Sequence, residues 1–147
     1  MRNMSNEFII KEYNTLPDEA RAIREEVFVL EQGFTEEFDS TDGKSTHFLL
    51  WVQGAERAVA TCRIFKGEED GVYLLGRFAV RKAYRGTGLG RILIKRAEES
   101  ATLLGATEIR IHSQARAQGF YEACGYESVG VFDEEEDCPH VWLAKRL

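Results

Sequence analysis

A glycine-rich segment set among arginines is the part of this sequence whose residue types most clearly indicate chemistry. Gly86, Gly88 and Gly90 alternate with other residues directly before an apolar helical pattern. The first N–H groups of a helix lack intrahelical acceptors and attract anions, and glycines let an anion approach the backbone closely. The basic residues around the glycines are Arg81, Lys82, Arg85 and Arg91. In a chain of formal net charge −6, this local positive charge indicates a phosphate-binding loop.

Three glycine-rich phosphate loops can be compared with this segment. A P-loop ends in Gly-Lys-Ser/Thr, but Gly90 is followed here by Arg91. The dinucleotide fingerprint needs a third glycine at the position that Arg91 occupies. A third pattern, Arg/Gln-x-x-Gly-x-Gly/Ala, is matched by Arg85, Gly88 and Gly90. A turn without function would need one glycine for its geometry, not three with arginines around them.

The elements on either side would hold this loop in place. An apolar run over residues 72–80 predicts a central strand buried on both faces, and apolar residues then repeat with helical spacing until Gly105. Further strands are predicted at 7–13, 46–52, 57–65, 108–112, 126–132 and 140–144, and further helices at 17–30 and 115–123. Ile23, Val27 and Leu30 form the apolar stripe of the first helix. The order predicts a mixed α/β fold, and the lack of a linker predicts a single domain over residues 1–147.

The bulk composition excludes several classes of protein. With 147 residues and 44% hydrophobic content, the chain can form a stable core without disulfides or a structural metal. Its acidic balance is a poor match to phosphate backbones, so we expect no nucleic-acid partner. Its apolar runs are too short for a membrane span and its first residues are polar, which predicts a soluble cytoplasmic protein. The cysteines are odd in number and fit no zinc spacing, so we expect neither disulfides nor a metal.

The glycine-rich segment resembles the pyrophosphate-binding loop of the GNAT superfamily of N-acetyltransferases. The strand before the loop and the order of elements along nearly the whole chain are also similar. Within the superfamily, the segment 27–34, the residues Asp39, Asp42 and His47, and the pair Pro139-His140 resemble the small bacterial ElaA-like branch. Asp137-Cys138 stand where that branch usually has Gly-Ile, and the acidic run 133–137 is expected in the last turn. The resemblance implies a central, mostly antiparallel sheet of about seven strands flanked by helices.

The resemblance also implies acetyl-CoA as the co-substrate. The backbone of the loop would hold the pyrophosphate, with Arg91 beside it, at Arg85, Gly86, Thr87, Gly88, Leu89 and Gly90. Backbone groups of Phe78, Ala79 and Val80 would lie along the pantetheine arm. Gln114 stands where the superfamily often has an asparagine that contacts the cofactor, and its amide can still donate and accept hydrogen bonds.

The same resemblance assigns Tyr121 as the general acid that protonates the leaving thiolate of CoA. The alternative is a tyrosine packed in the core with its hydroxyl satisfied locally. A base must also take a proton from the attacking amine, and the candidates are Glu31, Asp39, His47, His112 and His140. Glu31 and His140 rank first because the resemblance to the ElaA-like branch includes both, although a chain of water molecules without a single base stays open.

These expectations define the function that the sequence favours. It is an N-acetyltransferase that moves the acetyl group of acetyl-CoA to a primary amine of a small molecule or peptide. Acidic residues near the first helix and the following loop would suit a cationic acceptor such as a polyamine, an amino sugar or a lysine. The alternatives are a sensor that binds acyl-CoA without turnover and a nucleotide-phosphate binder of another fold. Dimers are common for such domains, so a homodimer stays open.

Overall fold

The computed structural model describes residues 7–34, 39–135 and 138–147. Its strands are β1 (Phe8–Tyr13), β2 (Thr46–Val52), β3 (Ala60–Lys66), β4 (Val72–Val80), β5 (Glu108–Gln114), β6 (Glu127–Glu135) and β7 (Cys138–Arg146). Its α-helices are α1 (Asp18–Arg24), α2 (Leu89–Leu103) and α3 (Gln118–Ala123). A π-helix η2 (Glu25–Glu31) and the 3-10 helices η3 (Ser40–Lys44), η4 (Lys82–Tyr84) and η5 (Ala115–Ala117) complete the elements. None of the helices in these ranges is both long and apolar enough to cross a membrane.

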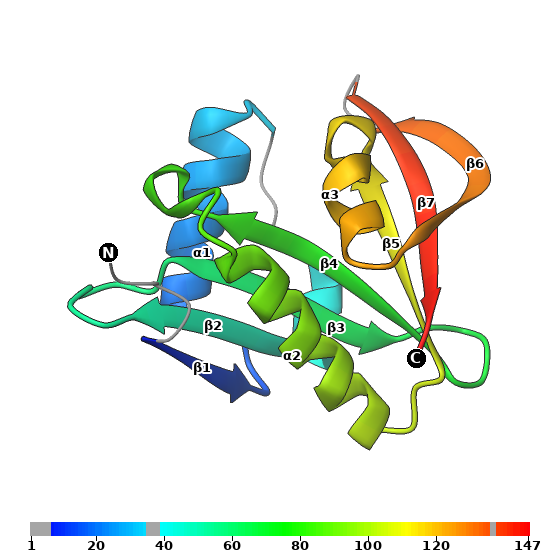
Figure 1. Cartoon of the computed structure of the whole chain (residues 1–147), viewed down its shortest axis with the longest axis horizontal. Coiled ribbons are helices and arrows are strands. Elements are labelled where there is room, and N and C mark those ends of the chain that lie inside the picture. Colours follow the sequence, from blue (N-terminus) through cyan, green and yellow to red (C-terminus); the bar gives the residue numbers. More distant parts are fainter. Residues whose placement is uncertain (1–6, 35–38, 136–137) are drawn as a thin grey trace.

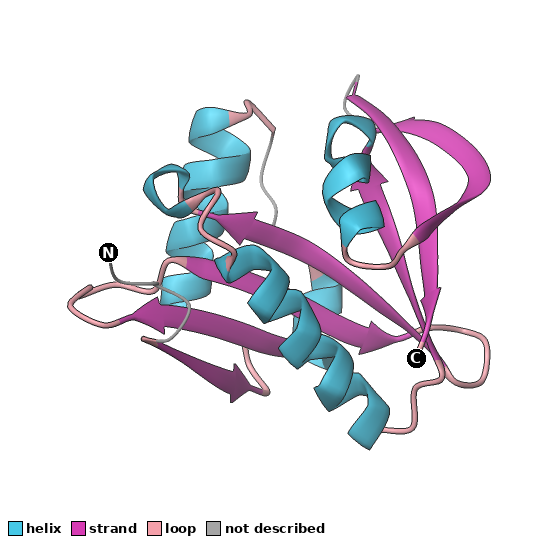
Figure 2. Cartoon of the chain, viewed as in Figure 1, coloured by secondary structure: helices cyan, strands magenta, loops and turns pink. Residues whose placement is uncertain are grey.

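The seven strands form one sheet in the order β1-β2-β3-β4-β5-β7-β6 (Figure 1). Every neighbouring pair is antiparallel except β4 and β5, which run parallel. Helices α2 and α3 lie on one face of the sheet, and α1 with η2 packs on the other (Figure 2). The predicted mixed α/β fold, with a mostly antiparallel sheet of about seven strands, is therefore confirmed.

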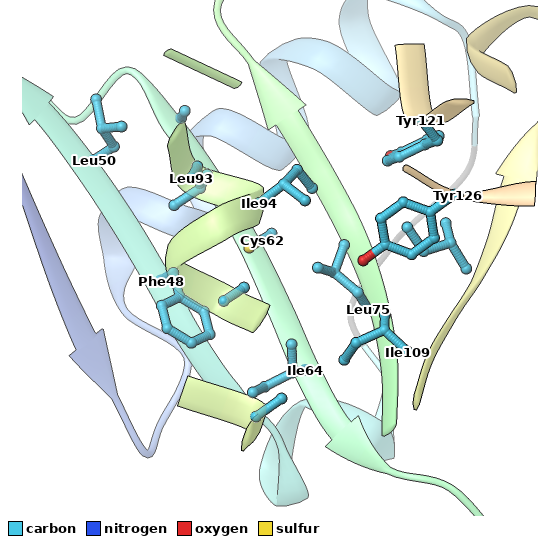
Figure 3. Close-up of a cluster of buried hydrophobic side chains, with 14 of the residues drawn as sticks. Phe48, Leu50, Cys62, Ile64, Leu75, Leu93, Ile94, Ile109, Tyr121 and Tyr126 are labelled. Carbon is cyan, nitrogen blue, oxygen red and sulfur yellow. The ribbon is translucent and has the colours of Figure 1, made fainter. Parts of the chain in front are cut away.

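The main core lies between α2 and the sheet. Leu93 and Ile94 of α2 are almost fully buried and lie over Cys62 and Leu75 (Figure 3). The helical spacing of the apolar residues in α2 turns one stripe toward the strands, which is the usual way that a helix covers a sheet. A second, smaller core lies on the opposite face, where Ile23 of α1 packs in a cluster with Leu49. The two cores hold β4 between them, in the middle of the sheet.

The first helix departs from the predicted stripe where it widens into η2. Ile23 and Val27 are buried as expected, but Leu30 is 75% exposed. The N–H of Gln32 bonds to the carbonyl of Val27, five residues earlier, so each turn of this segment holds more residues than an α-turn. The wider turn rotates Leu30 to solvent and brings Phe28 into the core instead. Such π-segments are frequent at functional sites.

Several boundaries differ from the sequence-based expectation. The helix η3 lies in a stretch predicted to be irregular, and it begins with a capping box between Asp39 and Asp42. β5 continues two residues beyond the expected end, to Gln114. The first part of the acidic run 133–137 belongs to β6 rather than to a turn, and Asp137 lies outside the described residues. β4 is not buried on both faces, because many of its residues are only half-buried.

Candidate active site

A cavity of about 680 Å³ lies where β4 and β5 separate. The two strands pair only from Val72 opposite Glu108 to Leu75 opposite Ile111, and beyond these residues they diverge (Figure 1). The rest of β4, residues 76–80, pairs with β3 on one side and, within the described part of the chain, has no neighbouring strand on the other. The half-buried state of β4 follows from this arrangement, because the cavity replaces the missing strand.

A bulge in β4 bends the strand at the cavity. Thr61 of β3 pairs with Ala79, but Arg63 pairs with Gly76, so that Arg77 and Phe78 together oppose a single residue of β3. Arg77 has φ 50°, in the left-handed region that non-glycine residues rarely adopt. A bulge re-aims the side chains that follow it, and strained backbone of this kind concentrates at functional sites. Phe78, Ala79 and Val80, predicted to lie along the pantetheine arm, all line the cavity.

The glycine loop forms one end of the cavity, where Gly86, Gly88 and Gly90 contribute to its wall. Gly86 and Gly88 have φ values of 77° and 85°, which only glycine adopts without strain. Gly90 has ordinary helical backbone, but a Cβ there would lie 2.9 Å from Cζ of Phe78, so this position needs glycine for space. In the described part of the chain, the N–H groups of residues 86–91 make no backbone hydrogen bond. Six donors at the start of α2 are therefore available to an anion.

The other loop residues divide into cavity-lining and structural groups. Arg85 and Arg91 line the cavity, and Arg91 also donates a hydrogen bond to the carbonyl of Ala123. Leu89 is buried in the core, and the hydroxyl of Thr87 donates to the carbonyl of Tyr84 at 2.7 Å, so only their backbone groups can face an anion.

One expected contributor to the positive charge of the loop lies elsewhere. Arg81 was expected to surround a bound phosphate together with the other basic residues. Its guanidinium instead donates to a carboxylate oxygen of Glu26 at 2.5 Å and to the carbonyl of Ala58 at 2.9 Å. The chain turns at Arg81 toward η2, so this charge is used to join the end of β4 to the first helix.

Tyr121 lies at the cavity wall, on the face of the sheet that α2 covers. Its ring makes edge contacts with Phe78 and Phe120, with ring centroids 6.0 and 5.2 Å apart. Its hydroxyl has no hydrogen-bond partner within the described residues, whereas the nearby Tyr126 hydroxyl donates to Glu98 (Figure 3). Burial raises the pKa of Tyr121 above its ordinary value, so the phenol keeps its proton at neutral pH.

Comparison with known proteins agrees with this geometry. Residues 9–126 match the Acetyltransferase (GNAT) family. The chain belongs to this GNAT family. It is 31% identical to protein ElaA of Escherichia coli (strain K12) over 82% of this chain and 81% of ElaA. The crystal structure of ElaA superimposes with a TM-score of 0.81 at 27% identity, covering 94% of this chain and 99% of that one. These matches confirm the resemblance to the ElaA-like branch.

Two further crystal structures are similar to this GNAT chain. One protein, from Lactobacillus plantarum, is 36% identical and superimposes with a TM-score of 0.85, covering 97% of this chain and 99% of that one. The other is an acyl-CoA N-acyltransferase from Pseudomonas aeruginosa, 28% identical, with a TM-score of 0.78 and coverage of 94% and 97%. Family and fold together identify an acyl-CoA-dependent acyltransferase with acetyl-CoA as its co-substrate.

The site of this GNAT protein fits that co-substrate. The unpaired N–H groups at the start of α2 suit the two negative phosphates of its pyrophosphate. The open edge of β4 presents backbone donors and acceptors that suit the amides of its pantetheine arm. Bound acetyl-CoA would supply the thioester whose acetyl group is transferred.

Two of the five candidate bases, His112 and His140, line the cavity. Their rings lie 4.6 Å apart between centroids, and His112 also stacks on Trp142 at 4.7 Å. Nε2 of His112 lies 2.7 Å from a carboxylate oxygen of Asp133. Nδ1 of His140 lies 2.9 Å from the carbonyl oxygen of Cys138, and because a carbonyl only accepts, this nitrogen carries the hydrogen. With the hydrogen on Nδ1, a neutral His140 ring would carry its lone pair on Nε2.

Asp39 and His47 belong to a buried ionic network and do not line the cavity. Asp42 accepts hydrogen bonds from Arg24 at 2.9 and 3.1 Å and from Arg63 at 2.7 Å. Asp39 accepts one from the same Arg63 at 3.0 Å, and His47 contacts the Asp42 carbonyl at 2.9 Å. Burial lowers the pKa of His47. Burial also acts to raise the pKa of Asp39, but the hydrogen bond from Arg63 and the nearby arginine charges outweigh it, so the pKa is lowered.

Glu31 has a different surrounding from that expected of a base. Both of its carboxylate oxygens accept hydrogen bonds from Arg85, at 2.6 and 2.8 Å. These bonds lower the pKa of Glu31 below its ordinary value, which makes the carboxylate a weaker proton acceptor. Glu31 does not line the cavity. These contacts count against Glu31 as the base, a role that stays a prediction, and the contact with Arg85 connects η2 to the glycine loop.

Gln114 lines the cavity, but its amide is engaged within the protein. Its nitrogen donates to the side-chain oxygen of Gln32 at 2.8 Å, and its oxygen accepts from Arg116 at 2.8 Å. The chain of bonds joins the end of β5 to the end of η2, across the gap between the diverging strands. The expected contact with the cofactor stays a prediction and would require one of these bonds to be exchanged.

Sequence reasoning missed several residues that line the site. Among them are Gln32, Arg63, Arg77, Phe120 and Trp142. Phe120 and Trp142 lie one and two positions from predicted site residues, and alternation along a strand could have placed Trp142 on the face of His140. The remaining three carry no local signal, because they reach the cavity only through the bulge, the π-helix and the pairing of distant strands.

Proposed function

We propose that this chain is an N-acetyltransferase that transfers the acetyl group of acetyl-CoA to a primary amine of a small molecule or peptide. The single observation that carries the proposal is the meeting of three features in one cavity. These are the unpaired N–H groups of the glycine loop, the open edge of β4 and the protonated, unbonded hydroxyl of Tyr121. Together they offer binding of a phosphate-bearing thioester and a proton at the place where its thiolate would leave.

Direct attack by the amine forms the C–N bond and breaks the C–S bond, without an enzyme-bound acyl group. The amine loses one proton, and the sulfur gains one. Tyr121 donates the proton to the sulfur as the general acid, since its raised pKa keeps the phenol protonated. His140 accepts the proton of the amine, directly or through water, at the Nε2 lone pair that its bond to the Cys138 carbonyl determines. In this proposal Glu31 acts on the loop through Arg85, not on the amine.

We also propose a reduced, cytoplasmic setting and a single acetyltransferase domain over residues 1–147. Both cores share the same sheet, and the cavity draws on residues from Val27 to Trp142.

The test compares Tyr121→Phe with the wild type and with Tyr126→Phe. Tyr121→Phe removes a hydroxyl that has no partner in the described structure, so the fold should persist, while kcat for CoA release with an accepted amine should fall about 10²–10⁴-fold. Its affinity for acetyl-CoA in calorimetry should be unchanged. Tyr126→Phe removes a hydroxyl that bonds to Glu98 outside the cavity wall, so it should affect stability and leave kcat nearly unchanged.

Each result that departs from these expectations contradicts a different part of the proposal. An unchanged kcat in Tyr121→Phe would contradict the role of this residue. Tight acetyl-CoA binding without turnover on any amine would contradict the enzyme and favour an acyl-CoA sensor. Equal binding of acetyl-CoA, ATP and NAD would remove the basis of the proposal, because the loop would then recognise any phosphate.

A further inference from the structure

The residues that line the cavity come from both faces of the sheet, and the two ends differ in chemistry. The glycine loop, Phe120 and Tyr121 lie on the face covered by α2 and α3. Side chains alternate along β5 and β7, so Ile111 and Val141 face α2 whereas His112 and Trp142 face the opposite side. In the proposed function, acetyl-CoA occupies the end of the cavity at the glycine loop. The opposite end is then available to the acceptor and is called the acceptor end.

Aromatic rings from four different elements line the acceptor end. Phe28 comes from η2, Phe34 from the segment after it, Phe65 from β3 and Trp142 from β7. Trp142, His112 and His140 pack ring against ring, with centroid distances of 4.7 and 4.6 Å and interplanar angles of 25° and 31°, so their rings support one another along this wall. Aromatic walls in which the rings support one another bury apolar groups at a low entropic cost.

The positive charge of the wall disfavours acceptors that carry a second positive charge. The cationic residues of the cavity lining are Arg63, Arg77, Arg85, Arg91 and Arg116. Among the described lining residues there is no aspartate or glutamate. The described arginines of the lining outnumber the described carboxylates that bond to them, so a second positive charge on an acceptor would meet net positive charge in a partly enclosed cavity where water screens poorly. The acids that contact lining residues already have partners there, since Asp39 and Asp42 bond to Arg63, Glu31 bonds to Arg85 and Asp133 bonds to His112.

We infer that the acceptor is a monoamine with an aromatic or large apolar body, and not a polyamine or an exposed lysine. The apolar body stacks between the Trp142–His112–His140 wall and the phenylalanines, which directs the single amino group toward the thioester near Tyr121. This inference rests on the proposed function and replaces the expectation of a cationic acceptor drawn from the acidic composition. Composition is a poor guide to the acceptor here, because no acidic side chain of the described residues lines the cavity.

The experiment measures kcat/KM for matched amines with wild-type protein and acetyl-CoA. The pair 2-phenylethylamine and ethylamine differs in the aromatic body, and the pair butylamine and 1,4-diaminobutane differs in the second charge. We expect kcat/KM to be at least about ten-fold higher for 2-phenylethylamine than for ethylamine, because a buried ring contributes several methylene equivalents of apolar burial. We also expect butylamine to exceed 1,4-diaminobutane and spermidine. Equal or higher values for the polyamines would overturn the inference.

Variants locate the effect in the aromatic end. Phe65→Ala should raise KM for 2-phenylethylamine about ten-fold, leave KM for ethylamine nearly unchanged and leave the affinity for acetyl-CoA unchanged. Phe132→Ala is the matched control, since this phenylalanine is 66% exposed on β6 and does not line the cavity. If the aromatic preference survives in Phe65→Ala and in Trp142→Ala, the inference is wrong.

Calorimetry separates this inference from the proposed function. 2-Phenylethylamine is titrated into the CoA-loaded wild type and into CoA-loaded Phe65→Ala. Binding that weakens in the variant supports the aromatic acceptor end even if no acetyl transfer occurs, in which case only the proposed function fails. Transfer to polyamines with no binding of 2-phenylethylamine supports the function and overturns the inference.

Discussion

Arg85 in the glycine loop and Glu31 at the end of the π-helix form an ion pair through two hydrogen bonds, at 2.6 and 2.8 Å. The residues lie 54 positions apart in the sequence. Arg85 also donates to the carbonyl of Val80 at 2.9 Å, so one guanidinium joins β4, the loop and the first helix. The ion pair neutralises the charge of Arg85 beside the N–H groups of the glycine loop and orients the guanidinium.

The substitution Glu31→Gln distinguishes two roles for Glu31. It acts either as the general base or as the ion-pair partner of Arg85 in the glycine loop. As a partner, Glu31→Gln should leave kcat within about two-fold of wild type, and acetyl-CoA should bind equally or a few-fold more tightly because a negative charge near the phosphates is removed. Loss of a general base would instead lower kcat about 10²–10⁴-fold. Steady-state kinetics and calorimetry give both numbers, and a loss in that range would restore Glu31 as the base.

The anion-binding role of Gly88 can be separated from backbone strain by a second glycine. Gly88 and Gly105 have φ values of 85° and 104°, and a Cβ at either would meet no atom within 4 Å. Alanine at either position should therefore lower the free energy of unfolding by a similar amount, about 1–2 kcal/mol. Only Gly88→Ala should weaken acetyl-CoA binding, by about ten-fold or more, since Gly105 lies at the far end of α2. Equal affinities in the two variants would mean that the loop is merely a turn.

The pH dependence of kcat follows from the raised pKa of Tyr121. Because burial holds this pKa above its ordinary value of about 10, the acid stays protonated as pH rises, and its loss should not limit kcat below about pH 10. With saturating amine, kcat should show no decrease between pH 8 and 10. A decrease with an apparent pKa near 8 or 9 that disappears in Tyr121→Phe would contradict the assigned environment.

The buried network around Asp42 should be a main source of stability at neutral pH. Burial acts to raise the pKa of Asp42, but hydrogen bonds from Arg24 and Arg63 outweigh it and hold the pKa well below its ordinary value. A depressed pKa in the folded state stabilises the fold above the unfolded pKa of about 4, and this contribution is lost as pH falls below that value. Asp42→Asn should lower the free energy of unfolding at pH 7 by about 3–5 kcal/mol, because it leaves buried arginine charge uncompensated.

Denaturant unfolding at pH 7 and at pH 3 tests this expectation. Asp70→Asn is the control, since Asp70 is exposed in the turn between β3 and β4. The stability difference between wild type and Asp42→Asn should shrink at pH 3, while Asp70→Asn should follow the wild type at both values. Wild-type stability in Asp42→Asn at pH 7 would show that the network adds little.

The order of strands and helices and the position of the phosphate loop were determined by the sequence itself. Apolar periodicity places a strand or a helix because its period is local, and Gly86, Gly88 and Gly90 act through backbone geometry within a single turn. Local patterning also placed a short helix after β5, and the resemblance to the GNAT superfamily identified Tyr121 on it. These features need only neighbours in the chain, so a single sequence is sufficient to predict them.

Only the tertiary structure determines which of the ionisable side chains contact one another. Glu31 is turned toward Arg85 and Leu30 toward solvent because η2 has the wider turn of a π-helix. No residue pattern in the sequence predicts this wider turn. His112 and His140 meet because β5 and β7 pair in one particular register, whereas His47 is enclosed by the network of Asp42. The cavity exists because β4 bends at Arg77 and separates from β5. Each of these outcomes depends on contacts between segments distant in sequence, whose register and packing local periodicity does not encode.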